Sequence, residues 1–293
     1  MRARIGSRGS NLAVWQARWV ADALARLKLP SEIVIIKTTG DRRLERFSTI
    51  DARGMFIKEI EEALLRREID LAVHSLKDLP VALPAKLLLA AIPERENPAD
   101  VLIAGQPAGS IAALAAGARV GTSSPRRIAQ LRALRPDLQI VEIRGNVETR
   151  IKSMDDGRTD AVVLAFAGVH RLGMDHRIGA MLDFKEMLPA PGQGALALET
   201  HEENRELNAL LRSLDHMPTR TATEAERLLL EKMGGGCRLP LGALAQWQGD
   251  TLHLQAVIAK PDSGELLRAE AAGDSAEEAA EKVSTSFASR MSS

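Results

Sequence analysis

Short apolar runs alternate with amphipathic helical patterns along about the first two hundred residues of this 293-residue chain, and this alternation constrains its fold most strongly. The run at 32–37 (EIVIIK) is typical of a strand, and the pattern at 11–28 is typical of a helix with one buried face. Later examples are a helical pattern at 110–116 and a strand pattern at 160–165. Strands that alternate with helices indicate mostly parallel sheets covered by helices, so we expect an α/β fold.

Two breaks in composition divide the chain. One lies at 93–98 (PERENP), and the other lies near 214–218. After the second break come a helical pattern, a glycine run, three strand patterns and a closing helix that starts near Ser275. This order of strand and helix patterns predicts a separate small α+β domain.

Basic and acidic residues balance, with 39 of each, so the formal net charge is zero. A neutral protein offers no global field to a nucleic acid or to an anionic membrane, and we expect neither as a partner. Among the basic residues, 29 are Arg and 10 are Lys. Codon bias would explain this excess, but so would binding sites for carboxylates or phosphates, because both suit the planar guanidinium group.

The motif GTSSPRR at 121–127 follows a strand pattern and opens a helix. Ser124 suits the N-cap and Pro125 suits the first helical position. Arg126 and Arg127 then fall in the first turn, where positive charge opposes the helix dipole. An anionic ligand at this helix end would explain the placement, and two solvated arginines are the alternative.

A second basic group, Arg144 and Arg150, follows the next strand pattern. From Arg119 to Arg150, seven Arg stand against three acidic residues. Ligands of open parallel sheets bind at the carboxyl ends of the strands. We therefore expect these arginines to share one rim with Arg126 and Arg127 and to bind a ligand that has several carboxylates.

The stretch HSLKDLP at 74–80 places Lys77 and Asp78 just after another strand pattern. A carboxylate in a cleft can stabilise a developing positive charge or move a proton. His74 is either a catalytic base or, as is more common for a lone His at a strand end, a structural residue.

The only cysteine, Cys237, follows three glycines. A single Cys excludes an intrachain disulfide and a multi-Cys metal site, and we expect no metal. A lone Cys is usually a small buried hydrophobic residue. Here the glycines and Arg238 favour an exposed thiol that acts as a nucleophile or as an attachment point.

The first residues, MRARIG, lack a secretory apolar region, and no stretch reaches the length of a transmembrane helix. We expect a cytoplasmic protein that is an enzyme or a small-ligand binder.

Eight stretches of the chain, taken together and in order, resemble the porphobilinogen deaminase (hydroxymethylbilane synthase) family. They are SRGSNLAVWQA at 7–17, GMFIKEIEEALL at 54–65, DLAVHSLKDLP at 70–80, GTSSPRR at 121–127, RGNVETR at 144–150, AGVHRLG at 167–173, LPAPGQGALALE at 188–199 and GGGCRLPLGA at 234–243. Each is a moderate signal alone, but all eight in order identify the chain as a member.

The resemblance implies a fold with two domains like type II periplasmic binding proteins and a hinged cleft between them, plus a small α+β domain at the C-terminus. The first domain is expected at 1–95, with 194–214 returning to it. The second is expected at 96–193, and the third, which attaches the cofactor, at 215–293.

The resemblance also implies an activity. Such a transferase condenses four porphobilinogen molecules head to tail into hydroxymethylbilane, with release of ammonia, in tetrapyrrole (haem) biosynthesis. The growing chain is built on a dipyrromethane cofactor that is bound covalently to a cysteine. A monomer is expected.

Roles follow from the resemblance residue by residue. Cys237 would hold the cofactor through a thioether, and Asp78 would be the catalytic carboxylate that stabilises the cation left when ammonia departs. The side chains that would bind the cofactor carboxylates are Lys77, Ser124, Arg126 and Arg127. Those that would line the substrate side are Arg8, Ser10, Arg144, Arg150 and Arg171.

The long polar segment 38–54 is typical of a lid or of a disordered loop, and the resemblance matches it to a mobile loop over the cleft. Arg53 stands near its end, where the family often has Lys, so the contacts of this segment are the least secure part of the comparison.

The alternative class is a non-catalytic carboxylate-binding protein of the periplasmic type, which would use the same arginines. The lack of a secretory region and the cysteine-bearing third domain oppose it, so we expect the enzyme.

Overall fold

The computed structural model describes residues 2–36, 52–106, 108–235, 239–260 and 263–291. The contacts between residues divide the chain into two compact units. Unit 1 comprises Met1–Arg95 and Ala195–Arg220, and unit 2 comprises Glu96–Gly194 and Thr221–Ser293.

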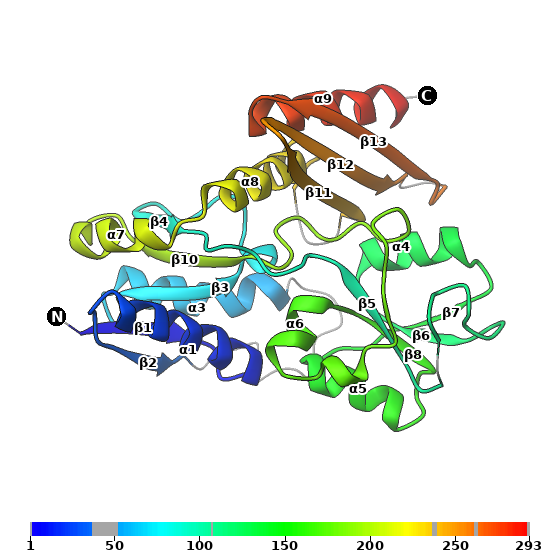
Figure 1. Ribbon diagram of the computed structural model, residues 1–293, viewed down its shortest axis with the longest axis horizontal. Helices are drawn as coiled ribbons and strands as arrows, with labels where there is room; N and C mark the ends of the chain where they lie inside the picture. The colour runs from blue at the N-terminus through cyan, green and yellow to red at the C-terminus, as the bar shows by residue number, and fades with distance from the viewer. Residues whose placement is uncertain (1, 37–51, 107, 236–238, 261–262, 292–293) are drawn as a thin grey trace. The chain divides into compact units, whose positions relative to one another are not determined.

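Unit 1 is built on a five-stranded mixed sheet in the order β2-β1-β3-β10-β4 (Figure 1). Its strands are β1 (Ala3–Ser7), β2 (Ser31–Ile35), β3 (Leu71–Ser75), β4 (Leu87–Ala91) and β10 (Leu196–His201). Strand β1 pairs in parallel with β2 and β3, whereas β10 runs antiparallel to both β3 and β4.

Helices cover both faces of this sheet. On one face, α1 (Asn11–Arg26) and α7 (Arg205–Leu211) bury apolar side chains against β1 and β3. On the other face, α3 (Ala52–Leu65) packs Ile60 and Leu64 against Ala72 and Leu87. The 3-10 turns η1 (Leu76–Asp78) and η3 (Arg212–Leu214) follow β3 and α7.

Unit 2 contains a second five-stranded sheet in the order β7-β6-β8-β5-β9. Its strands are β5 (Asp100–Ala104), β6 (Arg119–Gly121), β7 (Gln139–Val141), β8 (Ala161–Ala165) and β9 (Ala180–Met181). The parallel strands β6, β7 and β8 and the antiparallel β5 repeat the arrangement of the first sheet. Helix α4 (Pro125–Leu134) covers one face, and α5 (Val147–Asp155) and α6 (Phe166–Arg171) cover the other.

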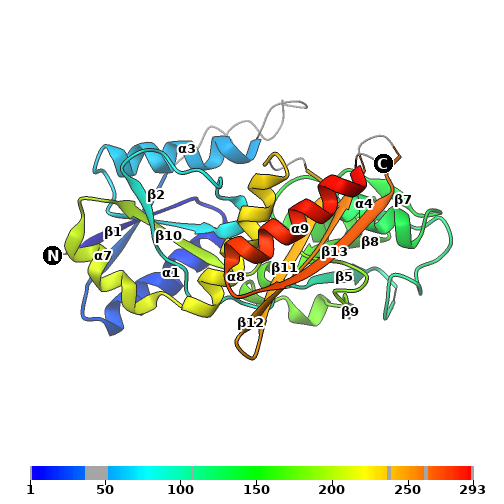
Figure 2. The ribbon, with the colours of Figure 1, turned by 90° about the horizontal axis from the view of Figure 1, so that it is seen from above.

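The last part of the chain forms an antiparallel sheet of β11 (Leu241–Gln248), β12 (Thr251–Ala259) and β13 (Leu266–Gly273). Helix α9 (Ala276–Met291) lies along it, as Figure 2 shows, and buries Val283 and Phe287 completely. Helix α8 (Met217–Lys232) contributes Ala225 and Leu229 to the same core.

The expected fold class is confirmed, since helices cover two α/β sheets and the end of the chain is α+β. One expectation was wrong, because residues 110–116 form turns instead of a helix. The expectation of mostly parallel sheets is confirmed, since four of the five strands in each large sheet run in the same direction and β10 or β5 is the exception. No helix in the described part of the chain combines the length and apolar character that a bilayer crossing needs.

Candidate active site

The described site residues that the sequence predicted all follow the carboxyl ends of parallel strands. In unit 1, strand β1 is followed by Arg8 and Ser10, and β3 is followed by η1 with Lys77 and Asp78. In unit 2, strand β6 is followed by Ser124, Arg126 and Arg127. Strand β7 is followed by Arg144 and Arg150, and the helix after β8 ends at Arg171. Strands β1 and β3 are neighbours, and so are β7, β6 and β8. Within each unit, therefore, the sheet gathers these residues along one edge, where α/β proteins bind their ligands.

The η1 turn presents Lys77 and Asp78 between two buried anchors. Leu76 is fully buried and Leu79 is nearly so, whereas Lys77 and Asp78 are only half-buried. The Leu76 amide donates to the Ala195 carbonyl at 3.0 Å, and the Leu79 amide donates to the Leu76 carbonyl at 3.1 Å. The two leucines therefore fix the turn while its charged side chains stay accessible.

The start of α1 is tied to the same edge. The Ser10 hydroxyl accepts a hydrogen bond from the Ala13 amide at 3.3 Å, so Ser10 is the N-cap of α1. One turn later, the buried Gln16 side chain donates to the Ser75 hydroxyl at 2.8 Å, at the end of β3. This bond connects the helix start that carries Ser10 to the strand end that leads to Asp78.

In unit 2, Arg126 and Arg127 are buried and share one carboxylate, that of Asp100. Each guanidinium donates to a different Asp100 oxygen, both at 2.7 Å, and Asp100 is completely buried at the start of β5. Arg126 also donates to the Leu188 carbonyl at 2.7 Å, and Arg127 donates to the Val163 carbonyl at 2.9 Å. The first-turn arginines therefore point back to the sheet edge instead of into solvent.

The buried Gln193 side chain completes this group, which we call the Asp100 centre and which consists of Asp100, Arg126, Arg127 and Gln193. Its amide donates to an Asp100 oxygen at 2.9 Å. Burial alone would raise the pKa of Asp100, but the charges of the two arginines and their hydrogen bonds hold it far below its usual range. Asp100 is therefore ionised, and the centre has a net charge of +1.

Asp100 and Gln193 were absent from the residues predicted from sequence. A signal for Asp100 was present, because it is an acid at the start of the apolar run VLIA, where a buried charge needs a cationic partner. Gln193 lies within the family stretch 188–199, but nothing in its local sequence indicates a contact with Asp100.

The Asp100 centre should make a large contribution to stability. We expect Asp100→Asn to lower the free energy of unfolding by about 3–5 kcal/mol, because two buried guanidinium groups lose their counter-charge. Urea unfolding of the purified variant measures this. The matched control is Asp160→Asn, since Asp160 binds Arg119 at 2.7 Å but both side chains are exposed, and a cost of about 1 kcal/mol or less is expected. Equal costs in the two variants would contradict the charge assignment.

The remaining residues of this edge are more exposed. Arg144 is exposed and forms an ion pair with Glu142 at 2.6 Å, and the half-buried Arg150 donates through Nε to the Gly145 carbonyl at 2.9 Å. Ser124 has the backbone conformation of an N-cap, but its side chain makes no capping hydrogen bond. The Ser124 hydroxyl therefore does not cap a backbone amide of α4.

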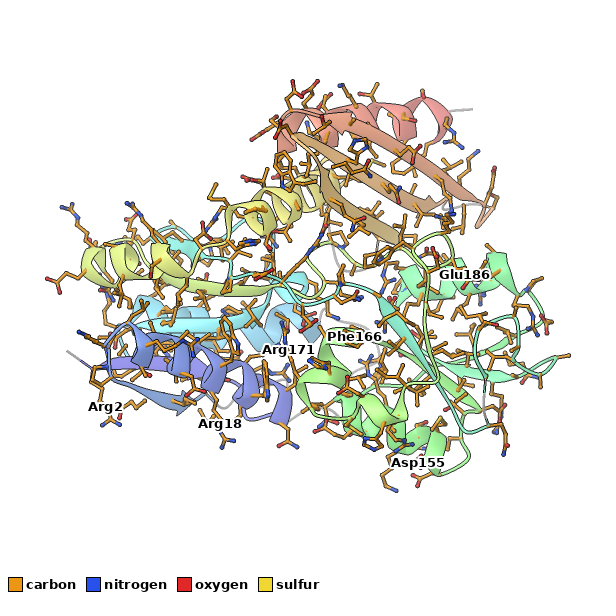
Figure 3. The ribbon with its side chains drawn as sticks, viewed as in Figure 1. Arg2, Arg18, Asp155, Phe166, Arg171 and Glu186 are labelled. Carbon is orange, nitrogen blue, oxygen red and sulfur yellow. The ribbon has the colours of Figure 1, made fainter. Side chains whose placement is uncertain are left out.

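Arg171 ends α6, where Figure 3 labels it together with Phe166. Its guanidinium donates to the Gly194 carbonyl at 2.7 Å. Gly194 has φ of +88°, and a side chain there would collide with the Glu96 carbonyl, so this position requires glycine. Burial lowers the pKa of Arg171 to about 10, and the charge of Glu96 opposes this shift. Arg171 stays cationic at neutral pH.

Cys237 and most of the segment 38–54 lie outside the described residues. The segment was expected to form no regular element, but its last residues, from Ala52, belong to α3. In the described ranges, no three His, Cys, Asp or Glu side chains are placed to hold a metal ion.

Two family models match the chain. The model described as "Porphobilinogen deaminase, dipyromethane cofactor binding domain" covers residues 3–209, and that described as "Porphobilinogen deaminase, C-terminal domain" covers 220–293. The chain belongs to the porphobilinogen deaminase family. Members of this family are transferases of tetrapyrrole biosynthesis that carry a dipyrromethane cofactor, so the resemblance seen in the eight stretches is confirmed.

Curated relatives named porphobilinogen deaminase agree with this assignment. The relative from Desulforudis audaxviator is 48% identical over 273 residues, which span 92% of this chain and 88% of that protein. The relative from Stenotrophomonas maltophilia is 49% identical and spans 92% and 90%.

Solved structures that match the chain are much less similar in sequence. The BvgS periplasmic VFT2 domain of Bordetella pertussis is 17% identical, covers 73% of this chain and 86% of its own, and has a TM-score of 0.44. A periplasmic substrate-binding protein from Coxiella burnetii is 15% identical, covers 74% and 93%, and has a TM-score of 0.45.

Proposed function

We propose that this chain condenses four porphobilinogen molecules head to tail into hydroxymethylbilane, with release of ammonia, on a dipyrromethane held by Cys237. Family membership over both matched regions supports the activity. The observation on this chain that carries the proposal is the net positive, buried Asp100 centre at the edge where β6 and β8 end.

The side chains at this edge suit a cofactor that has several carboxylates. Two guanidinium groups share a single carboxylate, so one positive charge of the Asp100 centre is not neutralised within it. The buried Nε of Arg127 has no hydrogen-bond partner among the described residues. Arginine binds carboxylates through paired hydrogen bonds, so a surplus of cationic donors fits the acetate and propionate groups of a dipyrromethane.

In this proposal, Lys77, Ser124, Arg126 and Arg127 hold the carboxylates of the cofactor, while Cys237 anchors it through a thioether. When bound, the cofactor supplies the pyrrole carbon to which the first substrate is joined. The residues that bind the carboxylates of the substrate and of the growing chain are Arg8, Ser10, Arg144, Arg150 and Arg171.

Asp78 is the catalytic carboxylate in this account. Loss of ammonia leaves positive charge on the pyrrole of the substrate, and a fixed carboxylate next to it lowers the energy of that state. The same group accepts or returns the proton at the pyrrole nitrogen. Its place between the anchors Leu76 and Leu79 supports this role, because a catalytic group must be held in a fixed position.

The proposal includes three domains, at 1–95 with 194–214, at 96–193 and at 215–293, and a cytoplasmic monomer that needs neither nucleic acid nor membrane. The balanced charge of the chain supports the absence of such partners. Light scattering of the purified protein tests the monomer.

The activity is tested by incubating the purified protein with porphobilinogen and measuring ammonia and hydroxymethylbilane. We expect one ammonia for each porphobilinogen consumed and one product for every four. The competing function is a carboxylate-binding protein without catalysis. Binding of porphobilinogen with no release of ammonia would support that function and refute ours.

A further inference from the structure

A second buried cluster of ionisable side chains lies in unit 1, apart from the residues already discussed. It consists of Glu61 on α3, His74 on β3 and Glu199 on β10, and we call it the Glu–His–Glu cluster. Glu199 is completely buried, His74 is 6% exposed and Glu61 is 9% exposed. The His74 Nε2 lies 3.0 Å from a Glu199 oxygen. His74 is thus a buried structural partner, as the more common interpretation of a lone His predicts.

The two carboxyl groups have fewer partners than their burial requires. Glu61 Oε1 and Glu199 Oε1 are both buried and have no hydrogen-bond partner among the described residues. With both carboxylates ionised, the cluster would have a net charge of −1 if His74 is protonated and −2 if it is neutral. Buried charge without a counter-charge is costly, so the cluster must retain a proton.

Glu61 is the group that keeps this proton. Its pKa is raised from 4.5 to about 7, chiefly by burial and also by the negative charge of Glu199, while His74 opposes the shift. Glu199 already pairs with His74, whereas the buried Oε1 of Glu61 has no hydrogen-bond partner among the described residues.

Other charged groups lie on the elements packed against α3, and α3 itself carries the half-buried Glu59 two positions before Glu61. On β1, Arg4 binds Asp70 at 2.8 Å. On β10, the Nδ1 of His201 accepts a hydrogen bond from the Glu203 amide at 3.2 Å. Strand β4 has no ionisable side chain, η1 carries Lys77 and Asp78, and the half-buried neighbour Glu62 on α3 pairs with Arg66 at 3.4 Å.

The cluster lies directly before the turn that carries Asp78. His74 is the fourth residue of β3, and Asp78 follows four positions later through η1. On the same side of the sheet, Ile57 of α3 packs with Leu76, Leu79, Ala195 and Ala197. Helix α3 and strand β10 therefore contact both ends of the segment from His74 to Leu79. The Glu–His–Glu cluster lies at its start, and the leucine anchors Leu76 and Leu79 follow.

We propose that the Glu–His–Glu cluster retains one proton, which resides mainly on Glu61. This proton makes Glu61 a positioning residue for the η1 turn and thereby for Asp78. Loss of the proton places a second unpaired negative charge between α3 and the sheet. The helix then loosens from β3 and β10, and the leucine anchors of η1 open more often. The link to turnover rests on the proposed role of Asp78.

The sign of the pH dependence follows from the raised pKa. Glu61 binds its proton more tightly in the folded protein than in the unfolded chain, so its contribution to stability is complete below pH 4.5 and is lost as the pH rises to about 7. Glu61→Gln keeps the neutral form at every pH. Relative to this variant, the unfolding constant of the parent protein should increase roughly tenfold or more between pH 5 and pH 8.

The experiment compares the parent protein, Glu61→Gln and the control Glu62→Gln, an adjacent residue of α3 whose side chain is 43% exposed. Three quantities are measured at pH 5 to 8.5: the infrared band of a protonated carboxyl group, amide hydrogen exchange at Leu76 and Leu79, and kcat. We expect a protonated-carboxyl band near neutral pH that Glu61→Gln lacks. We also expect opening of the two amides, corrected for intrinsic exchange, to increase with pH in the parent and in Glu62→Gln only.

The ratio of kcat in Glu61→Gln to kcat in the parent should increase severalfold above pH 7, with KM nearly unchanged, because the turn moves while the substrate contacts stay. If Glu61→Gln does not fold, Glu199→Gln replaces it and should move the loss of the same band to lower pH, since Glu61 then loses the negative charge that adds to the effect of burial on its pKa. Absence of the band, or pH-independent opening of η1, overturns the proposal. Band and exchange are measured without substrate, so they decide it even if the protein fails to consume porphobilinogen.

Discussion

Asp78→Asn should retain the bound cofactor and lose nearly all turnover, by about a hundredfold or more. Asparagine has nearly the shape of aspartate and can occupy the same half-buried place between Leu76 and Leu79. It has no negative charge to stabilise the cation left by ammonia, and it does not accept a proton at neutral pH. The measurement is kcat for porphobilinogen consumption, together with the intact mass of the variant.

The control for this variant is Asp22→Asn, the same chemical change at an exposed position of α1. It should have the activity of the parent protein. Substantial turnover by Asp78→Asn would remove Asp78 from the catalytic role, whereas a variant that lacks the cofactor would show that Asp78 acts in assembly of the cofactor.

Cys237→Ser should abolish the covalent cofactor and with it the activity. The chain has a single cysteine, so no other thiol can take its place. A serine hydroxyl is nearly isosteric but is a much weaker nucleophile at neutral pH, because it is not ionised. The intact mass should equal that of the sequence, and Ehrlich's reagent should detect no bound pyrrole in the denatured protein.

The parent protein, expressed and purified in parallel, is the control for Cys237→Ser and should react with Ehrlich's reagent. The serine change itself should leave the fold intact, so Cys237→Ser should still unfold cooperatively in urea. A normal amount of covalently bound pyrrole in Cys237→Ser would exclude a thioether at this position.

Local sequence patterns predicted most elements of the fold because each has its own periodicity or end signal. The helix predicted at 11–28 is α1, which begins after the N-cap Ser10, and the strand predicted at 160–165 is β8. The reversed direction of β5 and β10 is what these patterns did not indicate. Strand β5 is a short apolar run like its parallel neighbours, β10 contains polar residues, and the direction of both depends on partners far along the chain.

The same limit applies to the site. Sequence patterns placed Arg126 and Arg127 in the first turn of a helix, and this is where they lie. Their direction was not predictable, because Asp100, which binds both, precedes them by 26 positions or more and no local pattern joins the two segments. The Glu–His–Glu cluster likewise brings together three elements, with 125 positions between His74 and Glu199.

The excess of arginine has more than one cause. Arg2 and Arg18, which Figure 3 labels, are exposed on unit 1, and Arg2 pairs only loosely with Glu32 at 3.3 Å. Exposed arginines of this kind require no binding site to explain them. The same does not hold for Arg126 and Arg127, whose burial against one carboxylate has a physical cost that a functional or structural role must offset.

The central claim is that this chain builds a pyrrole chain on a cofactor attached to its own cysteine, and the intact mass of the protein during turnover tests it most directly. The purified protein should exceed its sequence mass by one dipyrromethane unit. Brief mixing with porphobilinogen should add a ladder of one to four further units, each lighter than porphobilinogen by one ammonia. A protein at its sequence mass that gains no such units would contradict the account.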